Sequence, residues 1–522
     1  MAFSRRKLLQ SSGAMAGAAL WTGQRGATAA PASTGLQFGP NLYESIGVTP
    51  IVNCRGTFTI ITGSQSLPEV KKAMEEASRH YVNMDELMNA VGQRLSELTK
   101  ADWGIVTGGC AAALTGATLA CIAGTNPERM QRIPKLDGLK NEVIIPKHSR
   151  NVYDHAVRMP GVDIIEVNSQ KELESSINPR TAMIMIMASP RADKGPLSTE
   201  NVCRIAKGRQ IPVVVDAAAE YLTIPNKHLG LGATMVAYSG GKCLRGPQAA
   251  GLLLGPKNLT QAAWLNSAPH HAFGRSLKVG KEEIMGMLAA VEMWTKRDHD
   301  AEWKQWESWL DAIRQRATSV PGVTAEIIQP VDLSNHAPEL RMRWDGSALG
   351  ITGKEVEDIL AKGRPRVFVA GSTGVRPDSM DSSVTIMPYM MQPEDYKIAA
   401  QALYAVLSKP PKIDAPLRPQ GEPSSIAGNW DLQVDYALGS ASHHLTLVQN
   451  GKSVAGVHQG ETISGDVRGS VYGNQAHFRS QQAIQGTSIG YDFTGTISGD
   501  KMSGDVSMGE YGRGRWTAVR RA

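Results

Sequence analysis

Short apolar runs alternate with helix-length segments between about residues 40 and 408. Four of these runs lack regular polar positions, which is typical of parallel strands covered by helices on both faces. They are EVIIP (142–146), DIIEV (163–167), AMIMIMA (182–188) and PVVVDA (212–217). Residues 66–99 show long helical periodicity. The pattern predicts an α/β fold with a mostly parallel central sheet and crossover helices over 40–300, followed by a small α+β subdomain over 301–408.

The pattern changes after a proline-rich stretch, 409–425, which we interpret as a linker. From 426 to 522, apolar and polar positions alternate around the hairpin signal Asn450-Gly451, and ISGD occurs at both 463–466 and 497–500. This predicts a C-terminal all-β domain, either an antiparallel barrel or a sandwich. The only metal-ligand types that stand out there are His443, His444 and His458. Without an accompanying carboxylate or cysteine, we interpret them as surface residues and expect no metal.

Residues 1–30 have the order of a secretory signal peptide. Paired arginines (Arg5, Arg6) precede Lys7 and a short Ala/Gly-rich stretch, and small residues mark a cleavage site near Ala29 or Ala30. The twin arginines favour the route that exports folded proteins, so we expect a periplasmic location. A disordered basic tail is the alternative. The later sequence has no apolar stretch of membrane-spanning length, so we expect no membrane association.

Composition narrows the possible partners. The chain has 522 residues, 20% charged, and four of its net six positive charges lie within residues 1–30. The nearly neutral remainder gives no electrostatic reason to expect nucleic-acid binding. Five cysteines occur singly, which predicts neither a disulfide framework nor a zinc site.

Lys242 carries the strongest chemical signal. It lies in SGGKCLRGPQAAGLLLG (239–255), between a glycine pair and an apolar run. A lysine amine attacks carbonyls only when neutral, and a tight, partly desolvated pocket favours that form. One use for such a lysine is to form an imine with pyridoxal 5′-phosphate. This cofactor also needs an acid facing its ring nitrogen, a cup for its phosphate and a flat partner for its ring.

Candidates for these three roles occur at predicted strand ends. Asp216 ends a buried strand and is the candidate acid, although it could instead cap the next helix; Ala218 could pack under the ring. Gly108, Gly109, Cys110 and Ala111 begin a predicted helix, where amides bind phosphate well, and Ser239 could add a hydrogen bond. His148 is the candidate flat partner, or else a structural histidine.

The order and the residues of these motifs resemble those of the fold-type I pyridoxal-phosphate enzymes, in particular the family that includes selenocysteine synthase and D-glucosaminate-6-phosphate ammonia-lyase. The matching stretches lie within about residues 45–405 and are VNCRGTFTIITGS (52–64), HYVNMDELMNAVGQRLSELTKA (80–101), GGCAAALTGA (108–117), the Lys242 segment and GRSLKVGKEEIMGMLAAVEMW (274–294). The resemblance implies Lys242 as the imine residue and Asp216 as the ring-nitrogen partner. It also implies a phosphate site at Gly109–Ala111 and Ser239, and a homodimer or larger homo-oligomer.

The resemblance also sets the expected reaction. The near-neutral mature chain and the export signal argue against selenium transfer to a tRNA. We expect α,β-elimination on an amino acid or amino-sugar acid, with Lys242 removing the α-proton and Asp216 keeping the ring protonated. The candidates for gripping the substrate carboxylate are Arg55, Arg275, Arg364 and Arg366. Transamination and racemisation remain open, as does a binding protein acting through its C-terminal β-domain.

Overall fold

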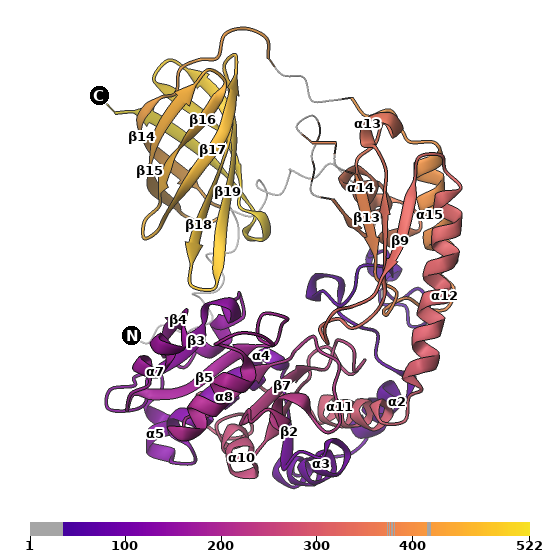
Figure 1. The fold of residues 1–522 in the computed structure, drawn as a ribbon, viewed down its shortest axis with the longest axis vertical. Helices are drawn as coiled ribbons and strands as arrows, with labels where there is room; N and C mark the ends of the chain where they lie inside the picture. Colours follow the sequence, from indigo (N-terminus) through magenta and orange to yellow (C-terminus); the bar gives the residue numbers. More distant parts are fainter. Residues whose placement is uncertain are drawn as a thin grey trace, which may run out of the picture. The chain divides into compact units, whose positions relative to one another are not determined.

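The computed structural model describes residues 35–372, 374, 376, 379–380, 382–414 and 419–521 (Figure 1). The predicted signal peptide, 1–30, lies outside the described residues. The chain divides into two compact units, Ile51–Pro416 and the combination of Met1–Pro50 with Leu417–Ala522. Among the described residues, no helix combines the length and the apolar character needed to cross a bilayer.

A seven-stranded sheet forms the centre of the Ile51–Pro416 unit. Its strand order is β2-β8-β7-β6-β5-β3-β4, and every neighbouring pair is parallel except the two that involve β8. The strands are β2 (Trp103–Thr107), β3 (Glu142–Pro146), β4 (Asp163–Val167), β5 (Thr181–Met187), β6 (Val213–Asp216), β7 (Met235–Ser239) and β8 (Gly251–Gly255). The mostly parallel sheet predicted from the apolar runs is confirmed. All residues of β2, β3, β6 and β8 are buried, because helices cover the sheet.

Ten helices of this large subdomain surround or flank the sheet. They are α2 (Pro68–Ser78), α3 (Met84–Thr99), α4 (Cys110–Ala123), α5 (Pro127–Arg132), α6 (Asp154–Arg158), α7 (Gln170–Ser176), α8 (Thr199–Gly208), α9 (Lys227–Gly230), α10 (Lys257–Leu265) and α11 (Lys281–Trp294). The periodic stretch 66–99 forms two helices, not one. It breaks at Asn83, whose side chain accepts hydrogen bonds from the amides of Asp85 and Glu86 and so begins α3.

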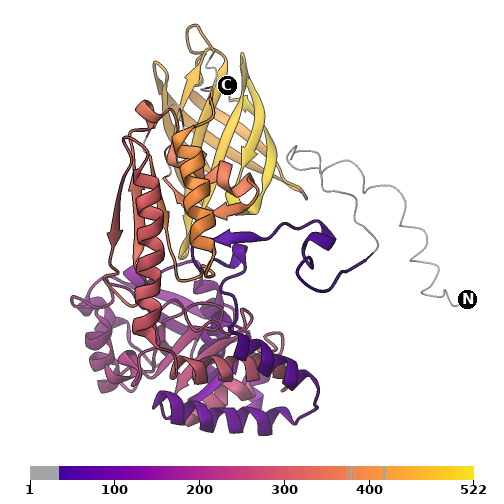
Figure 2. The same cartoon turned by 90° about the vertical axis from the view of Figure 1, so that its right-hand side faces the viewer.

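The small subdomain contains a four-stranded antiparallel sheet with order β12-β13-β10-β9. Its strands are β9 (Thr324–Ile328), β10 (Glu339–Arg343), β12 (Ala370–Gly371) and β13 (Ser383–Ile386); β1 (Ile51–Asn53) and β11 (Arg366–Phe368) form a separate parallel pair. Its helices are α12 (His299–Thr318), α13 (Gly346–Leu349), α14 (Gly353–Lys362) and α15 (Asp395–Ser408). The long helices α12 and α15 pack side by side (Figure 2). Leu310, Ile313 and Leu403 help to form a core separate from that of the large sheet.

The C-terminal strands form a closed, eight-stranded antiparallel barrel, which resolves the predicted choice between barrel and sandwich (Figure 1). The strands are β14 (Gly428–Asp435), β15 (Ser440–Asn450), β16 (Ser453–Gln459), β17 (Ser464–Tyr472), β18 (Gln475–Ile484), β19 (Thr487–Ser498), β20 (Lys501–Ser507) and β21 (Arg513–Arg520). The β15–β16 hairpin turns at Gly451-Lys452, directly after Asn450, which pairs with Ser453, and Gly451 has a φ of 56°. Trp430, Phe478 and Trp516 fill the interior.

The prediction that the barrel histidines lie on the surface is wrong for two of them. His443 and His458 are buried, and only His444 is exposed. In β15 the side chains alternate between interior and solvent, so His443 shares the inward face with Leu445. His443 Nδ1 lies 2.9 Å from His458 Nε2, and His458 Nδ1 lies 3.0 Å from Ser480 Oγ. The pair is therefore a hydrogen-bonded part of the barrel interior, and the described residues contain no group of three or more potential metal ligands.

Candidate functional site

The carboxyl ends of three strands meet at one edge of the large sheet. β2 ends at Thr107, β6 at Asp216 and β7 at Ser239. The antiparallel strand β8 begins at this same edge, where Gly251 is paired with both Thr107 and Ser239. Open α/β sheets bind ligands at this edge, beyond the carboxyl ends of their parallel strands.

A cavity of about 210 Å³ opens at this edge. Seven of the nine predicted cofactor-binding residues line it, namely Gly109, Cys110, Ala111, Asp216, Ala218, Ser239 and Lys242. They come from segments up to 133 positions apart in the chain. The fold therefore brings together the predicted lysine, acid and phosphate cup.

Asp216 is a buried carboxylate with no ion pair among the described residues. Its side chain accepts hydrogen bonds from the Ala218 amide at 3.0 Å and from the Cys110 thiol at 3.7 Å. Burial raises the pKa of Asp216, and the Ala218 hydrogen bond and the Lys242 charge oppose that rise. Burial also raises the pKa of Cys110, which keeps its thiol protonated and able to donate. A cation placed in the cavity would stabilise the Asp216 carboxylate, as a protonated pyridine nitrogen does.

The glycine turn at 108–109 aims the start of α4 at the cavity. Gly109 has a φ of 94°, and no neighbouring heavy atom lies within 4 Å of the position that a Cβ would take. No side chain caps α4. The Cys110 and Ala111 amides lie in its first turn and so lack acceptors within the helix. Free amides at the N-terminus of a 14-residue helix form a suitable cradle for a phosphate.

Lys242 follows β7 in a tightly packed turn. A Cβ on Gly241 would lie 2.7 Å from Gln248 Cα, and one on Gly240 would lie 2.8 Å from the Ala250 carbonyl oxygen. The glycine pair is therefore required by close backbone packing. Ser64 donates its amide to the Gly241 carbonyl at 2.9 Å, which fixes the turn further. Lys242 is half-buried and lines the cavity.

Two predicted cofactor residues do not line the cavity. Gly108 directly precedes the lining residue Gly109 in the chain and packs against the backbone of Leu277 and Lys278. His148 is engaged elsewhere, since its Nε2 lies 3.1 Å from the Leu197 carbonyl oxygen and its Nδ1 lies 3.1 Å from Ser149 Oγ. Because His148 does not line the cavity, the structure gives no support to its predicted role as the flat partner of the cofactor ring.

Of the four candidate arginines, only Arg55 lies beside a cavity that Lys242 also lines. Arg275 is exposed, and its guanidinium donates to the Pro269 carbonyl. Arg364 is exposed, whereas Arg366 donates from Nε to the Ala361 carbonyl at 2.9 Å. These three arginines line neither the cofactor cavity nor the cavity at Arg55.

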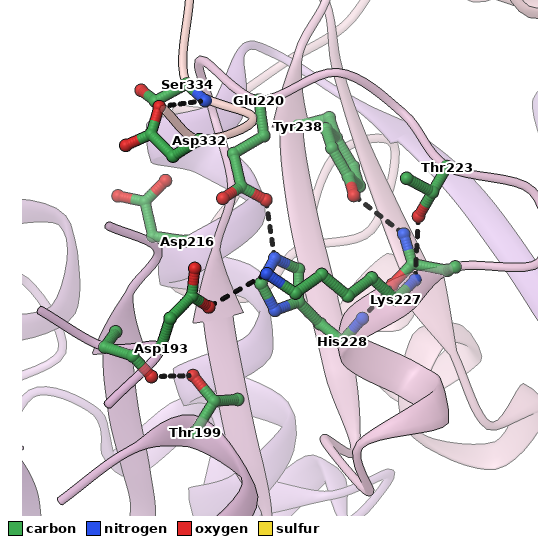
Figure 3. Close-up of polar contacts among 12 residues, drawn as sticks. Asp193, Thr199, Asp216, Glu220, Thr223, Lys227, His228, Tyr238, Asp332 and Ser334 are labelled. Carbon is green, nitrogen blue, oxygen red and sulfur yellow. Dashed lines mark hydrogen bonds and ion pairs between the residues drawn. The ribbon is translucent and has the colours of Figure 1, made fainter. Parts of the chain in front are cut away.

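Sequence reasoning missed several lining residues, notably Tyr153 and Glu220. Glu220 is 4% exposed, and its Oε2 lies 2.5 Å from Nε2 of the buried His228. Figure 3 shows this contact together with Asp216, which lies on the preceding strand. An acid four residues after Asp216, in DAAAE, was the available signal. Tyr153 lies at the start of α6 and offered no comparable signal.

The arrangement fits pyridoxal 5′-phosphate. Free helix amides and Ser239 would hold the phosphate, Asp216 would face the ring nitrogen, and Ala218 is small enough to lie under the ring. Lys242 would bond to the aldehyde. The fit rests on the buried Asp216 carboxylate, which has no ion pair among the described residues, and on the open space beside Gly109.

Comparisons with known proteins agree with this fit. The aminotransferase class-V family model matches residues 151–274. D-glucosaminate-6-phosphate ammonia lyase from Salmonella typhimurium is 29% identical over 339 residues, 63% of this chain and 89% of that protein. An L-seryl-tRNA(Sec) selenium transferase from Yersinia pseudotuberculosis is 23% identical over 281 residues, 48% of this chain and 58% of that protein.

A solved structure of D-glucosaminate-6-phosphate ammonia-lyase has a TM-score of 0.62 and 26% identity, covering 71% of this chain and 99% of its own. The fold, the cofactor and the resemblance to selenocysteine synthase predicted from the sequence are thereby confirmed. The chain is thus a fold-type I enzyme that uses pyridoxal 5′-phosphate as its cofactor.

Proposed function

We propose that the enzyme catalyses α,β-elimination on a 2-amino-3-hydroxy acid, either an amino acid or an amino-sugar acid. The observation that carries the proposal is the position of Lys242, which lines both the cofactor cavity and a second cavity of about 310 Å³. A substrate in the second cavity would present its α-carbon to the lysine amine. The relative named as an ammonia lyase also supports this class of reaction.

The reaction balances without an external oxidant or reductant. The α-proton leaves C2, the hydroxyl leaves C3 as water, and the unsaturated amine then takes up water. The products are a 2-keto-3-deoxy acid and ammonia. When bound, the cofactor supplies an electron sink for the charge that develops at C2.

The residues of this chain have separate tasks in the proposal. Lys242 takes the α-proton from C2 on its Nζ as general base, for which a half-buried amine beside the substrate cavity is suited. Asp216 holds a proton on the ring nitrogen, and burial makes the uncompensated carboxylate unfavourable without that partner. Arg55 binds the substrate carboxylate, because a guanidinium matches it with two parallel hydrogen bonds.

A panel of amino acids and amino-sugar acids tests this proposal. We expect purified, cofactor-loaded enzyme to release ammonia and a 2-keto acid in equal amounts from 2-amino-3-hydroxy acids. Lys242→Ala should abolish the release. Keto-acid formation that requires an amino acceptor would indicate transamination, and loss of optical rotation without ammonia would indicate racemisation; either result would overturn elimination.

We also propose that the protein is exported to the periplasm by the twin-arginine route and acts there as a homo-oligomer on a small amino substrate. Arg5 and Arg6 support the export route. Replacing both with lysine should leave the protein in the cytoplasmic fraction, and unchanged periplasmic recovery would contradict the route. Light scattering should give a mass at least twice that of the processed chain, and a monomer would contradict assembly.

A further inference from the structure

The second cavity, which we call the tail chamber, is formed largely by the small subdomain. Asn335 and Glu339 come from the β9–β10 segment, Thr385 comes from β13, and Tyr389 follows β13. The chamber meets the cofactor cavity at Thr59, Tyr153 and Lys242, which line both. A substrate whose α-carbon lies at Lys242 would therefore extend its remaining carbons into the chamber.

Two backbone hydrogen bonds hold one wall of the tail chamber in place. The Asn335 amide donates to the Ala219 carbonyl at 2.8 Å, and the Tyr221 amide donates to the Leu333 carbonyl at 2.8 Å. These bonds attach the β9–β10 segment to the residues that follow Asp216. The chamber is thus built at a fixed distance from the reacting end of the site.

Hydrogen-bonding groups for a hydroxylated chain line this chamber. The Tyr389 hydroxyl donates to Asn335 Oδ1 at 3.0 Å and lies 3.0 Å from Thr57 Oγ1. Burial raises the pKa of Tyr389 to about 12, which keeps its hydroxyl protonated. Asn335 Nδ2 and the Glu339 carboxylate have no hydrogen-bond partner among the described residues. The chamber therefore offers both an unused donor and an unused acceptor.

The charges of the chamber disfavour a second anion. Arg55 is its only cation besides Lys242 among the described residues, and Arg55 Nη1 is paired with Glu357 Oε1 at 2.8 Å. The α-carboxylate of the substrate needs that guanidinium. A phosphate on the substrate chain would then share the chamber with Glu339, whose carboxylate has no ion pair among the described residues. Like charges brought together in a partly desolvated site repel strongly.

We propose that the tail chamber receives an uncharged, polyhydroxylated substrate chain and rejects a terminal phosphate, with Glu339 as the residue that determines this specificity. The inference rests on the proposed function, because it places the reacting carbons at Lys242. Glu339 accepts hydrogen bonds from neighbouring hydroxyls, and Asn335 donates to one of them. The substrate class is therefore a 2-amino-2-deoxy sugar acid that is not phosphorylated.

The test compares three substrates: a six-carbon 2-amino-2-deoxy sugar acid, its terminal phosphate ester, and serine, which has no tail. We expect wild-type kcat/KM for the free sugar acid to exceed that for the ester by at least about 10-fold. Glu339→Gln should lower kcat/KM for the free sugar acid about 10-fold, because a charge-assisted hydrogen bond is lost, and should narrow the discrimination against the ester. Serine turnover should change less than about 2-fold, since serine has no carbons beyond C3 that could carry hydroxyls to Glu339.

Glu326→Gln is the matched control, because Glu326 is exposed on the neighbouring strand β9 and does not line the chamber. It should leave all three values unchanged. Preference of wild-type enzyme for the ester, or an unaltered free-acid value in Glu339→Gln, would overturn the proposal.

A binding measurement separates this proposal from the proposed function. Calorimetry with the six-carbon sugar acid that lacks the amino group, and with its phosphate ester, reports on the chamber without turnover. One outcome would refute elimination and still support the tail chamber. In that outcome no substrate releases ammonia, the free acid binds wild type at least about 10-fold more tightly than the ester, and Glu339→Gln removes that difference. Equal binding of the two compounds would refute the chamber alone.

Discussion

A side chain at Gly251 would perturb the phosphate cradle, because it would press on the Gly109–Cys110 backbone that begins α4. It lies at the start of β8, and a Cβ at this position would be 2.4 Å from the Gly109 carbonyl carbon and 2.6 Å from the Cys110 nitrogen. Ordinary van der Waals contact begins at about 3.4 Å. In Gly251→Ala the Gly109–Cys110 peptide must therefore retreat by about 1 Å, since the obstacle is backbone.

A shift of about 1 Å stretches a hydrogen bond of about 2.9 Å beyond the range in which it is effective. The loss of one amide hydrogen bond to a phosphate costs about 1.5–3 kcal/mol. The dissociation constant of pyridoxal 5′-phosphate should therefore rise roughly 10- to 150-fold in Gly251→Ala. The phosphate-free analogue pyridoxal should bind wild type and variant with similar affinity, because it makes no contact with the cradle.

Titration of cofactor-free protein with both compounds, followed by protein fluorescence, measures these affinities. Gly116→Ala is the matched control, because Gly116 lies on the same helix α4 and its Cβ would meet Ala263 Cβ at an ordinary 3.5 Å. It should keep both affinities. If Gly251→Ala folds as wild type and the ratio of the two affinities is unchanged, the assignment of the cradle is refuted.

Three further predictions concern buried polar groups. Asp216→Asn should retain the cofactor but lose at least about 100-fold in turnover, because the ring nitrogen loses its acidic partner. Absorbance reports whether the cofactor is retained and steady-state kinetics report the turnover. Unchanged turnover would mean that another residue is the partner of the ring nitrogen. Glu220→Ala should lower the free energy of unfolding by about 3 kcal/mol, because it leaves His228 buried without a partner, whereas Glu220→Gln should cost less; thermal unfolding of both variants checks the order. Burial, reinforced by the neighbouring His443, lowers the pKa of His458 to about 3, so the unfolded barrel binds a proton below about pH 6.5 that the folded barrel does not. The His458 contribution to folding stability should then fall by about 2 kcal/mol between pH 7 and pH 5, measured by pulse proteolysis of barrel strands in urea. His458→Gln should remove this contribution and leave that of His443, whose pKa burial also lowers; a stability that rises on acidification would contradict the prediction.

The sequence was sufficient to predict which residues line the cavity at the edge of the large sheet. Asp216 and Ser239 end apolar strands, and Lys242 lies three residues beyond the second of them. Because parallel strands end at one edge of a sheet, these residues had to converge. The glycine turn before α4 was identifiable for the same reason. Local pattern and topology together therefore predicted the cofactor cavity.

The tail chamber, which we propose for the substrate, could not be derived in this way. Asn335, Glu339 and Tyr389 come from segments of the small subdomain whose positions depend on tertiary packing. Charge alone makes Arg275 and Arg364 candidates for binding the substrate carboxylate, and charge does not specify which cavity a side chain faces. His443 is different, because the alternation along β15 already places it on the inward face with Leu445, whereas the surface interpretation rests only on the lack of an accompanying carboxylate or cysteine.

Borohydride reduction followed by peptide mass spectrometry tests the central claim most directly. Reduction fixes the cofactor to the lysine that holds it, and proteolysis then identifies that residue among all lysines of the chain. The account predicts a single phosphopyridoxyl-modified peptide that contains Lys242, formed with loss of visible absorbance. Modification of a different lysine, or none after reconstitution with the cofactor, would contradict it.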